Sequence, residues 1–259
     1  MRNKLTDELA VCGMNAIRAL SEVHPEKINR LFLREDRLPL FTKICKSLAE
    51  RKRPYKICEN EELEKICKTP HHQGIVAMIY DPVVENAAPE DIDSWAADGK
   101  TGLLLYNVGN DHNLGAIVRS AAFFNASPIV LTEQGGSEGE PIAKHLTTAA
   151  YRAAEGGMEY VEFRSVRRPA AFLQSATKKI FAIGTDPRAR IRIRDIPKII
   201  NNQEKPAGII LVIGNEETGL SEEIKEQCSI LARVPGTGAI ESLNAAQAAT
   251  LFLQELYER

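Results

Sequence analysis

The sequence lacks the signals of an exported or membrane-spanning protein. Its 259 residues contain no run of about eighteen apolar residues, and the N-terminus MRNKLTDELAVCG has no apolar signal-peptide core. Its five cysteines are an odd number and include no C-x-x-C pair, which argues against a disulfide framework and a structural zinc site. We therefore expect a cytoplasmic protein with no membrane contact and no metal, whose thiols are free and buried.

An excess of charge of one sign is also missing. The formal net charge is −2, with 44% hydrophobic and 26% charged residues, which is typical of a soluble globular chain and argues against extensive disorder. The near-neutral charge excludes a globally basic nucleic-acid binder. Local basic patches can still bind phosphates, because binding depends on where the charges lie.

Two common nucleotide-binding loops are absent as well, although the stretch VPGTGAIESLNAAQA, residues 234–248, has glycines before a helix-like run. A Walker loop needs G-x-x-x-x-G-K-[ST], which does not occur. A dinucleotide fingerprint needs a third glycine and an acid about twenty residues later. The chain ends eighteen residues after Glu241, so a nucleotide-dependent oxidoreductase is excluded.

The chain divides into three parts by pattern. Helix-like and strand-like stretches alternate over residues 1–80 and predict a small α/β domain. Residues 81–100 carry two prolines and six acids without apolar periodicity and predict a linker between domains. Residues 101–259 hold the aliphatic runs GLLLYNV, PIVLTE, KIFAIGT and GIILVIG between helix-like segments, which predicts a parallel sheet covered on both faces by helices. Residues 242–257 are rich in helix formers and predict a final helix.

Three loops that carry glycines and polar residues stand out. Each follows a strand-like run, and the third lies directly before the last predicted helix. Ligands of open α/β sheets bind beyond the carboxyl ends of strands, so these loops are the first candidates for a site. In NVGNDHNLGAIVRSAAFF, Asn113 could serve as the N-cap of the following helix, and Arg119 could be a solvated surface residue. In LVIGNEETGLSEEI, Gly214 permits close approach to the backbone and Gly219 suits a turn with positive φ, whereas Ser221 is typical of a helix cap.

The three loops together resemble the ordered motifs of the SpoU (TrmH-like) RNA methyltransferases of the SPOUT class. The matching residues are Asn113-x-Gly115-x-x-x-Arg119-Ser120, then Gly214-Asn215-Glu216-x-x-Gly219-Leu220, then Val234-Pro235 followed by Ser242-Leu243-Asn244. The stretches CGMNAIRAL and HHQGIVAMI resemble the start and end of the L30e-like RNA-binding domain that many of these enzymes carry. The resemblance covers nearly the whole chain.

This resemblance implies an α/β fold in which a small L30e-like domain precedes a SPOUT domain with a deep trefoil knot, an exception to the rule against knots. It also implies that S-adenosylmethionine is bound in the knot, largely by main-chain groups. By the same resemblance the cofactor contacts fall at Ile213, Gly214, Val234, Gly236, Gly238, Ile240 and Leu243. Motif three commonly begins Ile-Pro-Met in the family, whereas this chain reads Val-Pro-Gly.

For methyl transfer to a ribose 2′-hydroxyl, the resemblance places five polar residues at the active site: Arg119, Asn113, Glu216, Ser242 and Asn244. A guanidinium stays protonated at neutral pH and is a poor proton acceptor. We therefore expect Arg119 to hold the adjacent RNA phosphate and the hydroxyl in line with the methyl group. The proton would then leave through phosphate or water.

The implied partners are tRNA or rRNA and a second copy of the chain, since the family works as homodimers. A module of the same fold that binds RNA but has lost catalysis is the alternative. The presence of all five polar active-site residues favours the enzyme.

A separate feature is the alternation of arginines with smaller or apolar residues in RARIRIR, residues 188–194. In an extended chain this pattern places four guanidinium groups on one face. A phosphate-binding stripe and a solvated edge that discourages aggregation both fit the pattern.

Overall fold

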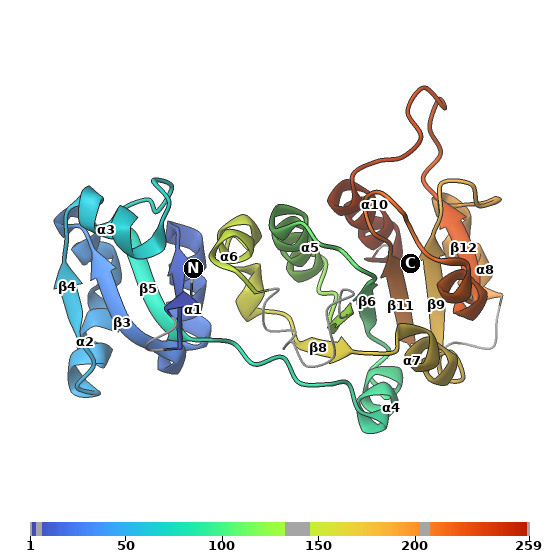
Figure 1. The fold of residues 1–259 in the computed structure, drawn as a ribbon. Helices are drawn as coiled ribbons and strands as arrows, with labels where there is room; N and C mark the ends of the chain where they lie inside the picture. Colours follow the sequence, from blue (N-terminus) through green and yellow to red (C-terminus); the bar gives the residue numbers. More distant parts are fainter. Residues whose placement is uncertain (1, 4–6, 133–145, 203–207, 258–259) are drawn as a thin grey trace. The chain divides into compact units, whose positions relative to one another are not determined.

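The computed structural model describes residues 2–3, 7–132, 146–202 and 208–257 of the chain. The chain forms two compact units (Figure 1). The first consists of Met1–Val83 and Ala143–Tyr160, and the second of Val84–Ile142 and Val161–Arg259. Each unit has its own sheet.

The first unit is built on a five-stranded sheet in the order β1-β2-β5-β3-β4. Its strands are β1 (Arg2–Asn3), β2 (Glu8–Cys12), β3 (Ile28–Leu33), β4 (Tyr55–Ile57) and β5 (Ile75–Tyr80). The helices are α1 (Met14–Val23), α2 (Thr42–Glu50) and α3 (Asn60–Cys67), with short 3-10 turns at Pro25–Lys27 and Glu35–Phe41. β5 lies between β2 and β3, antiparallel to both, and only its last residue is exposed, so the aliphatic run IVAMI forms the centre of this core. The expected small α/β domain is confirmed in its elements.

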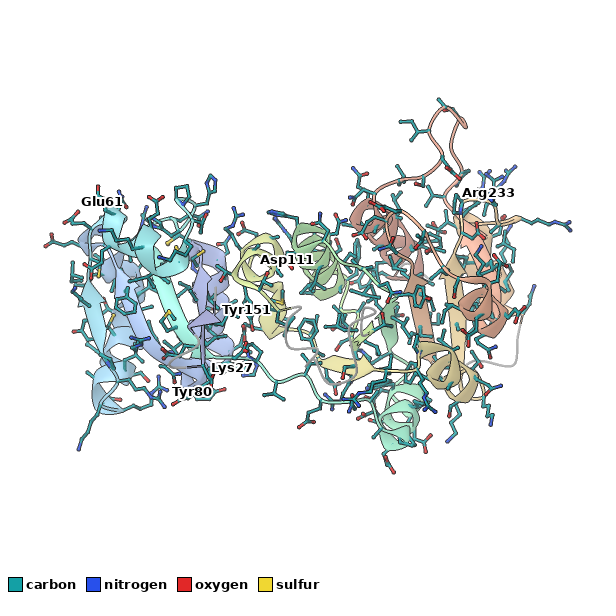
Figure 2. The ribbon with its side chains drawn as sticks, viewed as in Figure 1. Lys27, Glu61, Tyr80, Asp111, Tyr151 and Arg233 are labelled. Atoms are coloured by element: carbon teal, nitrogen blue, oxygen red, sulfur yellow. The ribbon has the colours of Figure 1, made fainter. Side chains whose placement is uncertain are left out.

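A segment from later in the chain completes the first unit. It contains α6 (Thr148–Ala154) and the 3-10 turn Gly157–Glu159. Thr148 Oγ1 donates to the carbonyl of Ala10 at 2.7 Å, and Lys27 pairs at 3.2 Å with Glu159, whose side chain is 2% exposed. At Gly156, where φ is +96°, an added Cβ would lie only 2.8 Å from the Cβ of Ala19, so this close packing requires glycine. Figure 2 labels Tyr151, a buried residue of α6, and Lys27.

The second unit is built on a seven-stranded sheet whose pairings are all parallel. Its order is β10-β12-β9-β11-β6-β7-β8. The strands are β6 (Thr101–Leu105), β7 (Ile129–Thr132), β8 (Phe163–Val166), β9 (Ile180–Thr185), β10 (Ile191–Arg192), β11 (Gly208–Ile213) and β12 (Ile230–Arg233). All six residues of β11 are buried, as expected for a central strand covered on both faces.

Helices cover both faces of this sheet. They are α4 (Pro89–Ala97), α5 (Asp111–Phe123), α7 (Pro169–Ala176), α8 (Ile196–Asn201), α9 (Glu222–Gln227) and α10 (Ala245–Tyr257), with a 3-10 turn at Ile193–Asp195. One core layer joins Trp95 of α4, Leu173 of α7 and Ile224 of α9 to alternate strand residues. α5 packs against α10, which also contacts β11 and α8. The predicted parallel sheet with helices on both faces is confirmed.

The stretch expected to be a linker, residues 81–100, instead contains α4. Pro89 occupies the first turn, where its missing N–H costs nothing, and the side chain of Asp91 accepts from the Ala88 N–H at 2.8 Å. Trp95 is buried and packs edge to face on Phe172, with ring centroids 6.5 Å apart. Pro89, Glu90 and Asp91, which were read as linker composition, are therefore the start of a helix of the second unit.

All five cysteines are free thiols, as expected. Cys12, Cys45, Cys58 and Cys67 are buried, and burial raises the pKa of Cys228 to about 12. The described residues hold no group of three or more His, Cys, Asp or Glu that could bind a metal ion. Over the same residues, no helix has the length and apolar character needed to cross a membrane.

The packing of α4 gives a test of where the second unit begins. Trp95→Ala removes a buried aromatic ring and leaves a cavity, so we expect the free energy of unfolding to fall by about 3–5 kcal/mol. Ser94→Ala, on the exposed side of the same helix, is the matched control and should change it by less than about 0.5 kcal/mol. Urea denaturation measures both, and an equal effect of the two substitutions would mean that α4 is only a tether.

Candidate active site

The candidate site lies at the carboxyl ends of parallel strands in the second unit. The loop 106–110 follows β6, the loop 214–221 follows β11, and the loop 234–244 follows β12. β6 and β11 are direct neighbours, and the Tyr106 N–H donates to the Ile213 carbonyl at 2.8 Å. Tyr106 Oη also donates to Ser221 Oγ at 3.3 Å, so the first two loops leave the sheet together.

The N-cap of α5 is Asn110. Its Oδ1 accepts from the N–H groups of His112 and Asn113, at 2.8 and 3.3 Å. Asn113, considered above as a possible N-cap, is therefore not the cap. Its side chain is available for contacts with the other loops.

Asn113 joins all three motifs by hydrogen bonds. Its Nδ2 donates to Glu216 Oε1 at 2.6 Å, and its Oδ1 accepts from Asn244 Nδ2 at 2.9 Å. A bond to a carboxylate is stronger than one between neutral groups, so Glu216 fixes the orientation of the Asn113 amide. Three residues expected at the site, one from each motif, thus form one chain of contacts, which we call the Asn113 bridge (Asn244, Asn113 and Glu216).

A second set of polar contacts holds the loops that carry this bridge. Asn215 Nδ2 donates to the Asn107 carbonyl at 2.8 Å, and Asn215 Oδ1 accepts from the N–H groups of Glu217 and Thr218 at 2.9 and 3.1 Å. The buried Thr132 hydroxyl accepts from the Asn107 N–H at 2.8 Å, where the chain has a positive φ of 54°. Sequence reasoning did not propose Asn107, Asn215 or Thr132 as site residues. The sequence signal that could have identified them is that each lies at or just after the end of a strand.

Gly214 is needed for a tight turn of the loop itself. A Cβ there would lie 2.5 Å from the carbonyl carbon of Gly219 and 2.7 Å from the Leu220 nitrogen. Asn215 and Gly219 close this turn with two backbone hydrogen bonds, of 3.2 and 2.9 Å, and Gly219 has the expected positive φ, +67°. The close approach expected of a ligand at Gly214 is made in this structure by the backbone of its own loop. Ser221 caps α9 as expected, since its hydroxyl accepts from the Ile224 N–H at 3.4 Å.

The motif-three loop, residues 234–244, is largely at the surface, and Figure 1 shows it as a long projection between β12 and α10. Ile240 is 82% exposed and Leu243 is 47% exposed, and a Cβ added to Gly236 or Gly238 would meet nothing within 4 Å. No backbone group of residues 235–243 pairs with another backbone group that the structure describes. Arg188 pairs with Glu241 of this loop at 3.0 Å.

The remaining expected residues lie at different depths. Ile213 is buried at the end of β11, and Val234 is half-buried after β12. Ser242 is exposed and makes no hydrogen bond to any residue that the structure describes. The structure therefore does not bring Gly236, Gly238, Ile240 and Ser242 against the Asn113 bridge.

Arg119 lies on α5 six residues after Asn113, about 120° around the helix. Its side chain is exposed and has no ion pair or hydrogen bond within the described chain. A free guanidinium can bind a phosphate with two parallel hydrogen bonds. Arg119 is therefore a candidate anion-binding group on the same helix as Asn113.

Comparison with protein families supplies the remaining context. The model of the SpoU rRNA methylase family matches residues 100–254, which is more than half of the chain. The chain belongs to the SpoU rRNA methylase family. A second model, for the substrate-binding domain of RNA 2′-O ribose methyltransferases, matches residues 10–82.

Relatives and solved structures agree with this assignment. This chain is 29% identical over 253 residues to the 23S rRNA (guanosine-2′-O-)-methyltransferase RlmB of Acinetobacter baylyi, and the alignment covers 94% of each chain. It is 26% identical over 257 residues to RlmB of Nitrosomonas europaea, covering 98% of this chain and 93% of the relative. An AdoMet-bound rRNA methyltransferase from Sinorhizobium meliloti has a similar fold, with a TM-score of 0.75 at 21% identity over 98% of this chain and 88% of its own.

The turn at Gly214 predicts a sharp contrast between two glycines of the site. Gly214→Ala forces a methyl group against backbone atoms, so we expect it to lower the free energy of unfolding by about 1–3 kcal/mol. Gly236→Ala meets open space and should change it by less than about 0.5 kcal/mol. Thermal or urea unfolding of both variants gives the comparison, and a Gly214→Ala variant as stable as Gly236→Ala would contradict the turn.

Proposed function

We propose that this SpoU methylase transfers the methyl group of S-adenosylmethionine to a ribose 2′-hydroxyl of tRNA or rRNA. The observation that carries the proposal is the Asn113 bridge, which joins residues from all three SpoU motifs beyond the carboxyl ends of parallel strands. The family match over residues 100–254 and the substrate-binding match over residues 10–82 support it.

The residues of the third loop suit the heterocyclic base of a ligand. The backbone groups of residues 235–243 lack backbone partners in the described chain, and Ile240 and Leu243 expose apolar surface beside them. Backbone N–H and C=O groups beside apolar side chains are what reads and stacks a heterocyclic base. We assign cofactor binding to Ile213, Gly214, Val234, Gly236, Gly238, Ile240 and Leu243. When bound, S-adenosylmethionine supplies a methyl group on a sulfonium, which is a good leaving group.

The polar residues position the RNA rather than take its proton. Glu216 holds the Asn113 amide, and Asn113 in turn holds Asn244, so three loops present one fixed polar surface to the ribose. Ser242 belongs to the same set and would contact the ribose when the third loop closes on its ligands. Positioning of this kind lowers a barrier by several kcal/mol, because the reacting groups are held in line.

Arg119 binds the RNA phosphate next to the reacting hydroxyl in this proposal. The 2′-oxygen gains the methyl group, and its proton leaves to a phosphate oxygen or to water. A guanidinium is a poor proton acceptor, so Arg119 acts by charge and geometry.

A homodimer is the proposed working form. Phe123 of α5 and Tyr257 of α10 are 81% and 64% exposed, and both rings contact Phe124 between them. Leu251 of α10 adds apolar surface at 39% exposure. An apolar aromatic face of this kind is typical of a protein interface, and a second copy of the chain is the partner that the family resemblance implies. The deep trefoil knot also stays a prediction from that resemblance.

Methyl transfer tests the function directly. Wild-type protein should bind S-adenosylmethionine in calorimetric titration and transfer labelled methyl groups to total tRNA or rRNA. Arg119→Ala should bind cofactor normally and transfer about 10²-fold or more slowly, because a positioning contact is lost. Arg168→Ala, at an exposed position before α7, is the control. Cofactor and RNA binding by the wild type without transfer would favour the catalytically inactive RNA-binding module, and full-rate transfer by Arg119→Ala would remove the role given to Arg119.

The dimer has its own test. Phe123→Glu combined with Tyr257→Glu places two charges on the apolar face, so we expect light scattering to give the mass of one chain instead of two. Leu40→Glu, at a residue of the first unit that is 59% exposed, should leave the mass unchanged. A wild-type protein that is monomeric at micromolar concentration would contradict the proposal.

A further inference from the structure

The strand β10 lies at one edge of the seven-stranded sheet and pairs with β12. The arginines at positions 188, 190, 192 and 194 on and beside it are all exposed, whereas Ile191 is half-buried and Ile193 is buried. Exposed arginines thus alternate with more buried residues, although only Ile191 and Arg192 form the strand and Arg194 lies in the 3-10 turn Ile193–Asp195. The guanidinium groups lie on the solvent side of this edge.

A fifth arginine adjoins this stripe. Arg192 and Arg233 are direct partners in the parallel pairing of β10 and β12, so their side chains leave the same face with backbones about 5 Å apart. Figure 2 labels Arg233, which is the residue immediately before Val234 of motif three. The arginine stripe is therefore continuous with the loop assigned to the cofactor.

Most of this positive charge has no internal counter-charge. Arg190, Arg192, Arg194 and Arg233 have no ion pair or hydrogen bond to any side chain in the described part of the chain. Arg188 forms an ion pair with Glu241, and the nearby carboxylate of Asp186 forms an ion pair with Lys225 at 3.0 Å. Like charges directly opposite each other on a sheet are destabilising, so this edge favours an anionic partner.

The chemistry of these groups points to a chain of phosphates, because several unpaired guanidinium groups gathered at one sheet edge suit a ligand with several negative charges. Arginine binds phosphate with two hydrogen bonds in a fixed plane, which lysine cannot do. We propose that Arg190, Arg192, Arg194 and Arg233 form a phosphate-binding edge that holds the RNA backbone beside the methyl-transfer site. This inference rests on the proposed function for the identity of the polyanion as RNA.

The test is the salt dependence of RNA binding by the full chain. Filter binding of labelled 23S rRNA transcript between 50 and 200 mM salt gives the slope of log Kd against log salt. Arg190→Gln, Arg192→Gln and Arg194→Gln together should reduce that slope by roughly two to three and weaken binding about tenfold or more at 100 mM salt. S-Adenosylmethionine binding should not change.

The matched control removes three positive charges elsewhere on the same unit. Arg168→Gln, Lys178→Gln and Lys179→Gln, at exposed positions around α7, should leave the slope within the error of the wild type. A second variant, Arg190→Lys with Arg192→Lys and Arg194→Lys, keeps the charge. It should retain most of the slope but bind less tightly, because the planar two-bond contact is lost.

The outcomes separate the two proposals. Equal slopes for the wild type and the triple glutamine variant would overturn the phosphate-binding edge and leave the stripe as a solvated edge that prevents sheet pairing. A wild type that binds RNA but neither binds S-adenosylmethionine nor transfers methyl would overturn the proposed function alone. The change in slope would then still decide whether the edge binds phosphate.

Discussion

The hydrogen bonds of Asn113 hold the candidate site together. One side-chain amide meets a carboxylate from the loop after β11 and another amide from the loop before α10. This is possible because Asn110 caps α5 and leaves the Asn113 side chain unused by the cap. The strands of the seven-stranded sheet also run parallel, so their carboxyl ends lie at the same edge. The tight turn at Gly214 and the hydrogen bond from Asn215 to Asn107 then fix the position of the loop that carries Glu216. The cap of α5, the parallel strands and the turn at Gly214 together place the three residues of the Asn113 bridge within hydrogen-bond distance of one another.

The fold could be predicted from the sequence where the strands are long and aliphatic. The runs behind β6, β7, β9 and β11 are such strands, and all four are confirmed. β8, β10 and β12 were missed, because FRSV, IR and ILAR are short and carry arginines that blur the apolar pattern. The helix α4 was missed for a different reason. A proline and several acids mark a helix start as readily as a linker, and only the burial of Trp95 separates the two.

The site was partly predictable for an equally physical reason. Asn113 lies in the first turn of α5, and Glu216 and Asn244 lie in the loops after β11 and before α10. A parallel sheet brings such segments to one edge, and the parallel sheet was predictable from the sequence. The supporting side chains of Thr132 and Asn215 bind backbone N–H and C=O groups, among them those of Asn107, and contacts of this kind leave no pattern in the sequence. The exposure of the third loop could not be predicted from the sequence either. The surface position of Ile240 and Leu243 depends on a loop that makes few contacts of its own.

The return of α6 to the first unit has a consequence for the order in which the chain folds. The sheet of that unit ends at Tyr80, but Thr148 and Glu159 are needed to cover Ala10 and pair with Lys27. A ribosome releases domains from the N-terminus onward. The first unit therefore cannot be completed until β6, α5 and β7 of the second have already emerged. The two units are interleaved along the chain, and no single cut in the chain would release either one whole.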